Sequence, residues 1–147
     1  MSGLVVRADA GGLPVAEASV DCVVTSPPYN VGMRYAGVSD ELSLEDYRAR
    51  AVQWTQEIAR ALRPGGRAWV NVSQSLPDLG RPRCERWSPA VLWHELLLAA
   101  GLLFGDWIVW RQVGADAATA WGSHLSPNAP NIRGRYELVL LFFKERW

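Results

Sequence analysis

A run of β-branched residues that stops at two consecutive prolines constrains the fold of this chain more than any other feature of its sequence. Residues 20–24 read Val-Asp-Cys-Val-Val and predict a buried β-strand, and residues 25–30 follow as Thr-Ser-Pro-Pro-Tyr-Asn. Proline has no backbone N–H, so two prolines in succession cannot continue a ladder of hydrogen bonds. The strand must therefore stop, and a stiff turn must follow at the carboxyl edge of a sheet, where open α/β sheets bind their ligands.

This turn carries a family resemblance. Ser26, Pro27, Pro28 and Tyr29 match one for one a pattern of a small polar or acidic residue, two prolines and an aromatic residue. The pattern resembles the catalytic motif of the DNA amino-methyltransferases, which methylate the exocyclic nitrogen of cytosine or adenine, and the form with serine first is similar to the N4-cytosine branch. The resemblance implies S-adenosyl-L-methionine as cofactor, double-stranded DNA as partner, and these four residues as the catalytic loop, with Ser26 also close to the cofactor.

The chemistry of such a transfer explains the residue types. An exocyclic amine is a poor nucleophile because its lone pair is delocalised into the ring, so the site must accept hydrogen bonds from it. Ser26 Oγ and the Pro27 carbonyl are suited acceptors, and fixed oxygen dipoles stabilise the positive charge that develops on the nitrogen. Tyr29 would stack on a base swung out of the duplex, a movement that costs roughly a few kcal/mol. The alternative is a structural Pro-Pro turn or a ligand of a proline-recognition domain, but such ligands are usually exposed and repetitive.

Length and composition predict a single domain. The chain has 147 residues, of which 49% are hydrophobic, enough for one core of ordinary size. No stretch approaches the length of a membrane span and no signal-peptide pattern follows Met1, so we expect the cytoplasm as its compartment. Cys22 and Cys84 have neither metal-ligand spacing nor the density of a disulfide scaffold, which predicts free thiols and no bound metal.

The charges are unevenly distributed although their sum is zero. Residues 1–47 carry 2 basic and 7 acidic side chains, whereas residues 48–147 carry 13 and 8. The later part is therefore the better candidate for a DNA-facing surface. Of the 15 basic residues 14 are arginine, which suits phosphate contacts, but a preference for arginine codons explains this composition equally well.

The rest of the chain predicts strands that alternate with helices. Residues 4–9 predict a short strand that ends at Asp9. Related methyltransferases place here a Gly-Asp pair whose aspartate faces the cofactor, so the resemblance implies a cofactor contact for Asp9. A turn-forming role beside Gly11 and Gly12 is equally consistent with the sequence. The two histidines, His94 and His124, have no partner at catalytic spacing and are interpreted as surface residues.

A capped amphipathic helix is the clearest local pattern. Ser43 is a candidate N-cap, and Asp46 completes a capping-box pattern. Apolar residues then recur at spacings of three and four, at Leu44, Tyr47, Ala51, Trp54, Ile58 and Leu62. The sequence Pro-Gly-Gly at residues 64–66 is expected to end the helix and residues 67–73 to form a strand.

The second half predicts one more helix and two more strands. Ser88 and Pro89 make an N-cap and first helical position, and the helix is expected to run to Ala100. A strand at residues 106–112 should bury Trp107 and Trp110 in the core. Residues 135–144 predict the final strand, which begins with the Tyr-Glu pair and hydrophobic run typical of the family.

Two polar loops are candidates for DNA contact. Residues 74–88 interleave arginine with tryptophan, and residues 113–134 contain no periodic pattern, as is typical of functional or disordered loops. Side chains of these types contact phosphates and bases in other proteins, although a solvated loop that happens to be arginine-rich is the slightly favoured interpretation. Together with Asn30, which follows the Pro-Pro-Tyr sequence, the candidates are Arg81, Arg83, Arg86, Trp121 and Ser123.

The resemblance predicts an α/β fold, a Rossmann-like methyltransferase sheet with helices on both faces, and this sheet is expected to be incomplete. The Phe-x-Gly-x-Gly cofactor loop of the family is not found, so residues 1–147 are expected to be the catalytic part of a DNA methyltransferase domain without the cofactor motif and without most of the target-recognition region. The expected function is site-specific methylation of cytosine N4, as in restriction-modification systems. Adenine N6 methylation, a non-catalytic or decayed DNA-binding module, and a second chain that supplies the cofactor-binding half are the alternatives left open.

Overall fold

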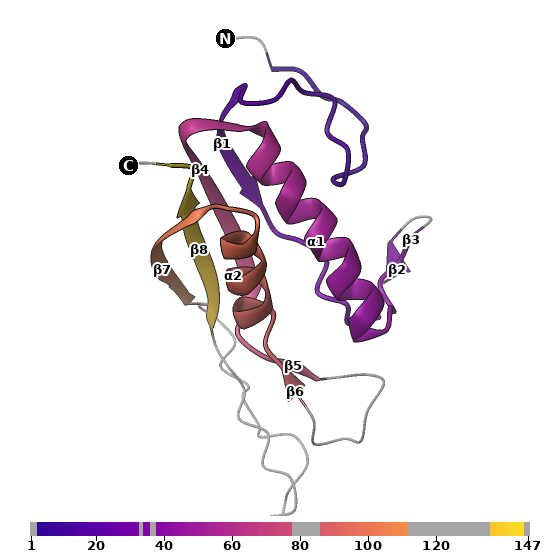
Figure 1. Cartoon of the computed structure of the whole chain (residues 1–147). Coiled ribbons are helices and arrows are strands. Elements are labelled where there is room, and N and C mark those ends of the chain that lie inside the picture. The colour runs from indigo at the N-terminus through magenta and orange to yellow at the C-terminus, as the bar shows by residue number, and fades with distance from the viewer. Residues whose placement is uncertain (1–2, 33, 36–37, 78–85, 112–135, 146–147) are drawn as a thin grey trace, which may run out of the picture.

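The structure is a computed structural model that describes residues 3–32, 34–35, 38–77, 86–111 and 136–145. The chain order of its helices and strands is β1 (Val20–Thr25), β2 (Arg34–Tyr35), β3 (Val38–Ser39), α1 (Leu44–Ala61), β4 (Leu62–Ser73), β5 (Leu76–Pro77), β6 (Arg86–Trp87), α2 (Pro89–Ala99), β7 (Leu103–Arg111) and β8 (Tyr136–Phe143) (Figure 1). The predicted α/β class is confirmed. No helix in the described ranges is long and apolar enough to cross a membrane.

The sheet that positions the candidate site has four strands in the order β1-β4-β8-β7. β1 and β4 are parallel, whereas β8 is antiparallel to both β4 and β7. Parallel strands end at the same edge of a sheet, so the carboxyl ends of β1 and β4 lie together. β8 lies between β4 and β7 although it follows both in sequence, and this order brings the amino end of β8 to that same edge.

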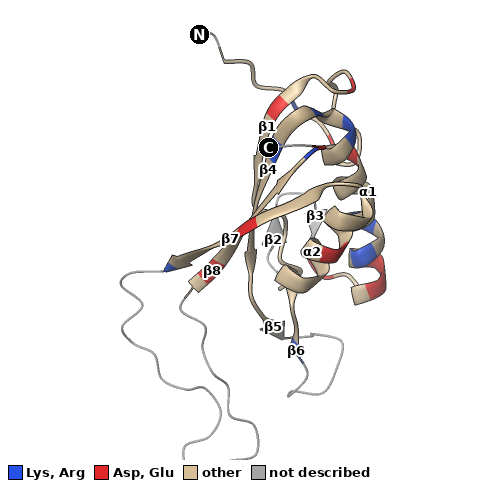
Figure 2. Cartoon of the chain, turned by 60° about the vertical axis from the view of Figure 1, so that its left-hand side comes forward, with Lys and Arg blue, Asp and Glu red and all other residues tan. Residues whose placement is uncertain are grey.

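Both helices lie on one face of this sheet, as the turned view shows (Figure 2). In the described part of the chain, the expectation of helices on both faces is therefore met on one face only. Alternate residues of β4 and β8 point toward the helices, because side chains alternate between the two faces of a strand. The fully buried members of this set are Ala68, Val70 and Val72 in β4 and Leu140 and Phe142 in β8. They form one core with the inward faces of α1 and α2.

The first helix confirms its predicted cap and face. Ser43 Oγ accepts a hydrogen bond from the Asp46 N–H at 3.0 Å and donates one to the Asp46 carboxylate at 2.7 Å. Tyr47, Ala51 and Ile58 are buried on the inward face. The helix ends at Ala61, before the Pro-Gly-Gly sequence that was expected to stop it, and β4 begins at the next residue.

The Pro-Gly-Gly sequence instead shapes the start of β4. Gly65 has φ of +79°, a left-handed conformation that favours glycine, and its N–H donates to the Lys144 carbonyl at 2.8 Å. A Cβ added to Gly66 would lie 2.8 Å from the Arg63 carbonyl oxygen. The pairing register of β1 with β4 shifts at this point, between Val20 and Cys22. The two glycines thus belong to a bulged strand. Their local sequence pattern is the same as that of a helix stop, so the sequence does not distinguish the two.

The second helix is capped as predicted, but the aromatic residues after it are not buried. Ser88 Oγ accepts a hydrogen bond from the Val91 N–H at 3.3 Å. Trp107 and Trp110 are 43% and 57% exposed, against the expectation of a core position. β7 is the last strand of the sheet, so its side chains have neighbours on one side only. His94 is not a surface residue, because its ring is half-buried and packs 5.7 Å from that of Trp107.

The predicted strand at residues 4–9 is not formed. Leu4 and Val5 are 88% and 98% exposed, and the segment pairs with no strand in the described part of the chain. A β-pattern alone does not stabilise a strand, because each strand needs a neighbour for its backbone hydrogen bonds. The predicted strands at 20–24 and 135–144 do form, since each has a partner in the sheet.

Candidate active site

The proline loop leaves β1 at the carboxyl edge of the sheet and borders a cavity. This cavity has a volume of about 740 Å³, and Ser26, Pro27 and Pro28 line one side of it. Arg50 and Trp54 of α1 line it from the helix side. The motif therefore lies where the sequence predicted it, at the edge of the sheet where ligands of open α/β sheets bind.

The first two residues of the loop differ in exposure. Ser26 is exposed and Pro27 is buried. Within the described ranges, Ser26 Oγ forms no hydrogen bond to another residue, so the hydroxyl is available to a ligand in the cavity. A hydroxyl can accept and donate a hydrogen bond at once.

A buried tyrosine holds the loop from the helix side. The Tyr47 hydroxyl donates a hydrogen bond to the Pro28 carbonyl at 2.7 Å, and Trp93 Nε1 donates to the Tyr47 oxygen at 3.2 Å. Tyr47 is 1% exposed, and burial raises its pKa to about 12. The hydroxyl therefore stays protonated around neutral pH and remains a donor. The sequence marked Tyr47 only as a core residue of the helix.

The end of the loop is held by an asparagine in a left-handed conformation. Asn30 has φ of +55° and is 6% exposed. Its Nδ2 donates to the Leu42 carbonyl at 2.8 Å, and its Oδ1 accepts from the Leu42 N–H at 2.7 Å. The Asp40 carboxylate accepts the backbone N–H groups of Asn30 and Val31. The side chain predicted to contact DNA is thus committed to the interior, and we assign Asn30 to the support of the loop.

The tyrosine of the motif lies on the opposite face of the sheet from Tyr47. Its hydroxyl donates to the Glu137 carboxylate at 3.1 Å, and Asn71 Nδ2 donates to the Tyr29 hydroxyl oxygen at 3.2 Å. The ring of Tyr29 is half-buried. Glu137 belongs to the predicted Tyr-Glu strand, so its sequence position was recognised, but its contact with the loop was not.

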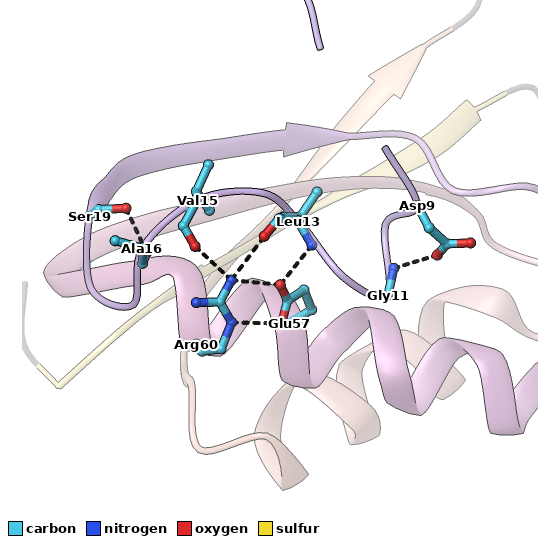
Figure 3. A network of polar contacts seen from close by, with 8 residues as sticks. All are labelled: Asp9, Gly11, Leu13, Val15, Ala16, Ser19, Glu57 and Arg60. Atoms are coloured by element: carbon cyan, nitrogen blue, oxygen red, sulfur yellow. Dashed lines mark hydrogen bonds and ion pairs between the residues drawn. The ribbon is translucent and has the colours of Figure 1, made fainter. Parts of the chain in front are cut away.

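Asp9 has both features that the sequence left open. It lines the cavity, as a cofactor contact would require, and its Oδ1 accepts the Gly11 N–H at 2.7 Å, as a turn-forming aspartate would (Figure 3). The turn is observed, and the cofactor contact stays a prediction.

The segment after Asp9 is held against α1 by hydrogen bonds to Arg60 and Glu57, which form an ion pair within that helix. Arg60 Nη2 donates to the carbonyls of Leu13 and Val15, and Glu57 Oε1 accepts the Leu13 N–H at 2.8 Å (Figure 3). Hydrogen bonding from Arg60 lowers the pKa of Glu57. This connection fixes one wall of the cavity, because Leu13 is among its lining residues.

Most of the predicted DNA contacts fall outside the described residues. These are Arg81, Arg83, Trp121 and Ser123, and His124 and Cys84 also lie there. Arg86 is described and exposed, and its guanidinium donates to Ser75 Oγ at 2.7 Å and to the Ser75 carbonyl at 3.0 Å. Its contact with DNA stays a prediction. Cys22 is a free, exposed thiol.

Comparison with known proteins confirms the family resemblance. Residues 20–147 match the family model of the N6/N4 DNA methylases. The type II methyltransferase M.MjaVI of Methanocaldococcus jannaschii is 30% identical over 129 residues, which are 88% of this chain and 64% of that protein. The type II methyltransferase M.ScaI of Streptomyces caespitosus is 42% identical over 62 residues, 42% of this chain and 19% of that protein.

Solved structures show the same fold. A protein of Thermus thermophilus assigned as a DNA modification methylase, solved with S-adenosyl-L-methionine, is similar with a TM-score of 0.61 and 26% identity over 89% of this chain and 48% of that one. The cytosine-N4-specific PvuII DNA methyltransferase has a TM-score of 0.61 at 18% identity, over 91% of this chain and 45% of that one. This chain therefore spans about half the length of these solved relatives, and the predicted methyltransferase sheet is confirmed.

Proposed function

The chain belongs to the N6/N4 family of DNA methylases, and from that premise we propose that it takes part in methyl transfer from S-adenosyl-L-methionine to an exocyclic amine of DNA, with N4 of cytosine as the target. One observation carries the proposal. The loop of Ser26, Pro27, Pro28 and Tyr29 stands at the carboxyl end of β1, borders an open cavity, and is held on both sides of the sheet.

The cavity fits part of the methyl donor. Its volume of about 740 Å³ lies within the range of small-molecule sites. Trp54 offers apolar surface, and Asp9 and Arg50 offer opposite charges along its lining. S-adenosyl-L-methionine would supply a methyl group made electrophilic by the neighbouring sulfonium. The residues of this chain then have to hold the amine and stabilise its charge.

The loop residues perform these two tasks. Ser26 Oγ and the Pro27 carbonyl accept the N–H groups of the amine, which directs its lone pair toward the methyl carbon. As the nitrogen bonds to that carbon, the carbon–sulfur bond of the donor would break and the neutral thioether S-adenosyl-L-homocysteine would leave. The nitrogen becomes positively charged, and the same two oxygens stabilise the charge. The nitrogen then loses one proton to solvent, which restores a neutral amine. The oxygens need no reorganisation during this step, because Tyr47 and Asn30 hold the loop beforehand.

The remaining part of the donor site would come from polypeptide outside this sequence, either further along the same protein or in a second chain. β1 is the first strand in the sheet order, and its outer edge pairs with no other strand in the described ranges. Val24 in this strand is 78% exposed. An unprotected edge strand readily accepts another strand, so we place the cofactor-binding half against β1.

The choice of cytosine rests on Ser26 as the first residue of the motif. A serine there resembles the N4-cytosine branch, and adenine N6 remains the alternative within the same family. Both bases present an amine beside a ring nitrogen, so the pocket contacts around Tyr29 have to separate them. A nucleoside assay distinguishes the two directly.

The test is a methylation assay with deuterated donor. The chain, supplied with the cofactor-binding polypeptide, is incubated with plasmid DNA and S-adenosyl-L-methionine carrying a CD₃ group, and the nucleosides are analysed by mass spectrometry. We expect CD₃ on N4 of deoxycytidine, and a rate about 10²-fold lower for Ser26→Ala. Ser19→Ala is the matched control, because it removes an exposed hydroxyl just before β1 begins.

Each other result has a defined meaning. CD₃ on N6 of deoxyadenosine would show that the target base is adenine and not cytosine. DNA binding without any transfer, unchanged in Ser26→Ala, would favour a non-catalytic DNA-binding module. An unreduced rate in Ser26→Ala would contradict the role of the hydroxyl.

A further inference from the structure

Three polar side chains meet at the carboxyl edge of the sheet, on the face away from the helices. The Tyr29 hydroxyl donates to Glu137 Oε2 at 3.1 Å, and Asn71 Nδ2 contacts both the Tyr29 oxygen at 3.2 Å and Glu137 Oε2 at 2.5 Å. Each residue therefore touches the other two. The three come from β4, β8 and the loop after β1, and the sequence distance between Tyr29 and Glu137 is 108 residues.

The strand register determines this meeting point. Val70 and Val72 of β4 point into the helix-side core, so Asn71 between them points to the opposite face. Leu138 of β8 is likewise in the core, so its neighbour Glu137 shares the face of Asn71. In the antiparallel pairing of β4 with β8, Asn71 lies opposite Val139, two residues from Glu137. Such diagonal neighbours are within reach of long side chains.

One atom of this network indicates that its role is not simply stability. Asn71 Oδ1 is buried and has no hydrogen-bond partner among the described residues. The amide is oriented so that Nδ2 faces two acceptor oxygens, and this leaves its own oxygen unpaired. A buried, unpaired acceptor is costly, and such groups in native proteins call for an explanation. In this orientation the amide donates to the oxygens of both Tyr29 and Glu137.

We infer that Glu137 and Asn71 are positioning residues that fix the ring of Tyr29 for stacking on the target base, an inference that rests on the proposed function. The loop is then held from both faces of the sheet, with the Pro28 carbonyl bonded to Tyr47 on the helix side and the Tyr29 hydroxyl bonded to Glu137 on the other. A ring held in advance loses less freedom when the base arrives, which strengthens stacking.

The contact itself is tested without reference to activity. The chain contains four tyrosines, and 3-fluorotyrosine labelling gives each a fluorine resonance that single Tyr→Phe variants assign. In Glu137→Ala we expect the Tyr29 resonance to move and the Tyr47 resonance to stay. Glu145→Gln is the matched control, because it neutralises an exposed glutamate beyond the other end of β8. A Tyr29 resonance unmoved by Glu137→Ala would overturn the inference.

The positioning role is tested by kinetics of the assembled enzyme on DNA. We expect kcat/KM to fall about tenfold in Tyr29→Phe and in Glu137→Ala, and to stay within about threefold in Glu137→Gln, whose amide oxygen still accepts the hydroxyl proton. The double variant should also lose about tenfold and not a hundredfold, because both changes remove the same hydrogen bond between Tyr29 and Glu137.

The outcomes separate this inference from the proposed function. The positioning role would be overturned if the wild type is active and Tyr29→Phe and Glu137→Ala keep its full kcat/KM. It would also be overturned if the two losses multiply in the double variant. Either result would leave the proposed methyl transfer unaffected. An assembled wild-type enzyme that transfers no methyl group would contradict the proposed function, whatever the fluorine spectra show. Tyr29→Phe removes a single hydroxyl, so it provides the test even if Glu137→Ala fails to fold.

Discussion

At the scale of the residue, the loop is held by side chains that its own sequence does not include. Tyr47 bonds to the Pro28 carbonyl, Asp40 accepts two backbone N–H groups, and Glu137 accepts the Tyr29 hydroxyl. The motif residues were predicted from their types and order. Their supports were not, because a tyrosine on an apolar helix face and a glutamate in a strand look the same whether or not they touch the loop.

Removal of the Tyr47 hydroxyl should weaken both the fold and the site. Tyr47→Phe leaves the Pro28 carbonyl and Trp93 Nε1 without their partner, and we expect a loss of about 1–3 kcal/mol in the free energy of unfolding. Urea denaturation measures this change. Phe is close in shape, so a loss well above this range would show that the ring packing also changed. An unchanged midpoint would show that the hydrogen bond adds no net stability.

The raised pKa of Tyr47 also leads us to expect a loss of stability of the wild-type protein in alkali. Its pKa is raised from the ordinary 10.0 to about 12 by burial, so between these values the unfolded chain ionises and the folded chain does not. The contribution of Tyr47 to the free energy of unfolding is complete below pH 10 and is lost as the pH rises toward 12. The loss amounts to at most about 2–3 kcal/mol. Denaturation at pH 9 and pH 11 should show the loss in wild type and a smaller one in Tyr47→Phe.

Asn30 combines a backbone requirement with a side-chain requirement, and two substitutions separate them. Asn30→Gly keeps the left-handed conformation at φ of +55° but loses the bonds to Leu42, whereas Asn30→Ala loses both. We expect Asn30→Ala to be less stable than Asn30→Gly by about 1 kcal/mol. Thermal denaturation measures the difference. Equal stabilities would indicate that the backbone conformation relaxes in the alanine variant.

At the scale of the element, the two helices were predicted correctly because their signals are local. A cap bonds to an N–H three residues away, and an apolar face repeats every three or four residues. The strand at residues 4–9 and the burial of Trp107 were predicted wrongly, because both depend on what lies beside the strand. The pattern that predicts a strand does not say whether a neighbour exists.

The connector between residue 9 and β1 should loosen in acid. Hydrogen bonding to Arg60 lowers the pKa of Glu57 in the folded chain, so the stabilisation is present above the ordinary pKa of glutamate and is lost as the pH falls through the lowered value. Glu57→Gln should show the loosened state at neutral pH. Hydrogen exchange of the Leu13 amide measures it, because this N–H donates to Glu57.

The control for this prediction is Glu45→Gln, which neutralises an exposed glutamate on the same helix. Exchange at Leu13 should be faster in Glu57→Gln and unchanged in Glu45→Gln. Equal protection in both variants would contradict the role of the ion pair.

At the scale of the whole molecule, both outer strands and one face of the sheet are uncovered in the described part of the chain. Val24 is 78% exposed at the edge, and Trp110 is 57% exposed on the face away from the helices. An unprotected edge strand readily accepts another strand. The proposal that a cofactor-binding half pairs with β1 predicts that this surface is needed for assembly and not for the fold of the chain.

Val24→Lys tests that prediction. The substitution places a charge on an exposed position, so the free energy of unfolding of the chain should change by less than about 0.5 kcal/mol. Assembly with the cofactor-binding polypeptide, measured by titration calorimetry, should weaken at least about tenfold, because the charge would be buried at the new strand pair. Val91→Lys, at a 51% exposed position on α2, is the matched control. Unweakened assembly in Val24→Lys would place the partner elsewhere.

The sequence alone determined where β1 stops, where both helices begin, and which four residues form the loop, because proline geometry and helix caps act over a few residues. Only the tertiary structure decided that β8 lies between β4 and β7, and with this order that Glu137 meets Tyr29 from 108 residues away. It also decided that both helices cover one face. Contacts of this kind depend on strand order and register, which arise when the whole core packs and which no local pattern encodes.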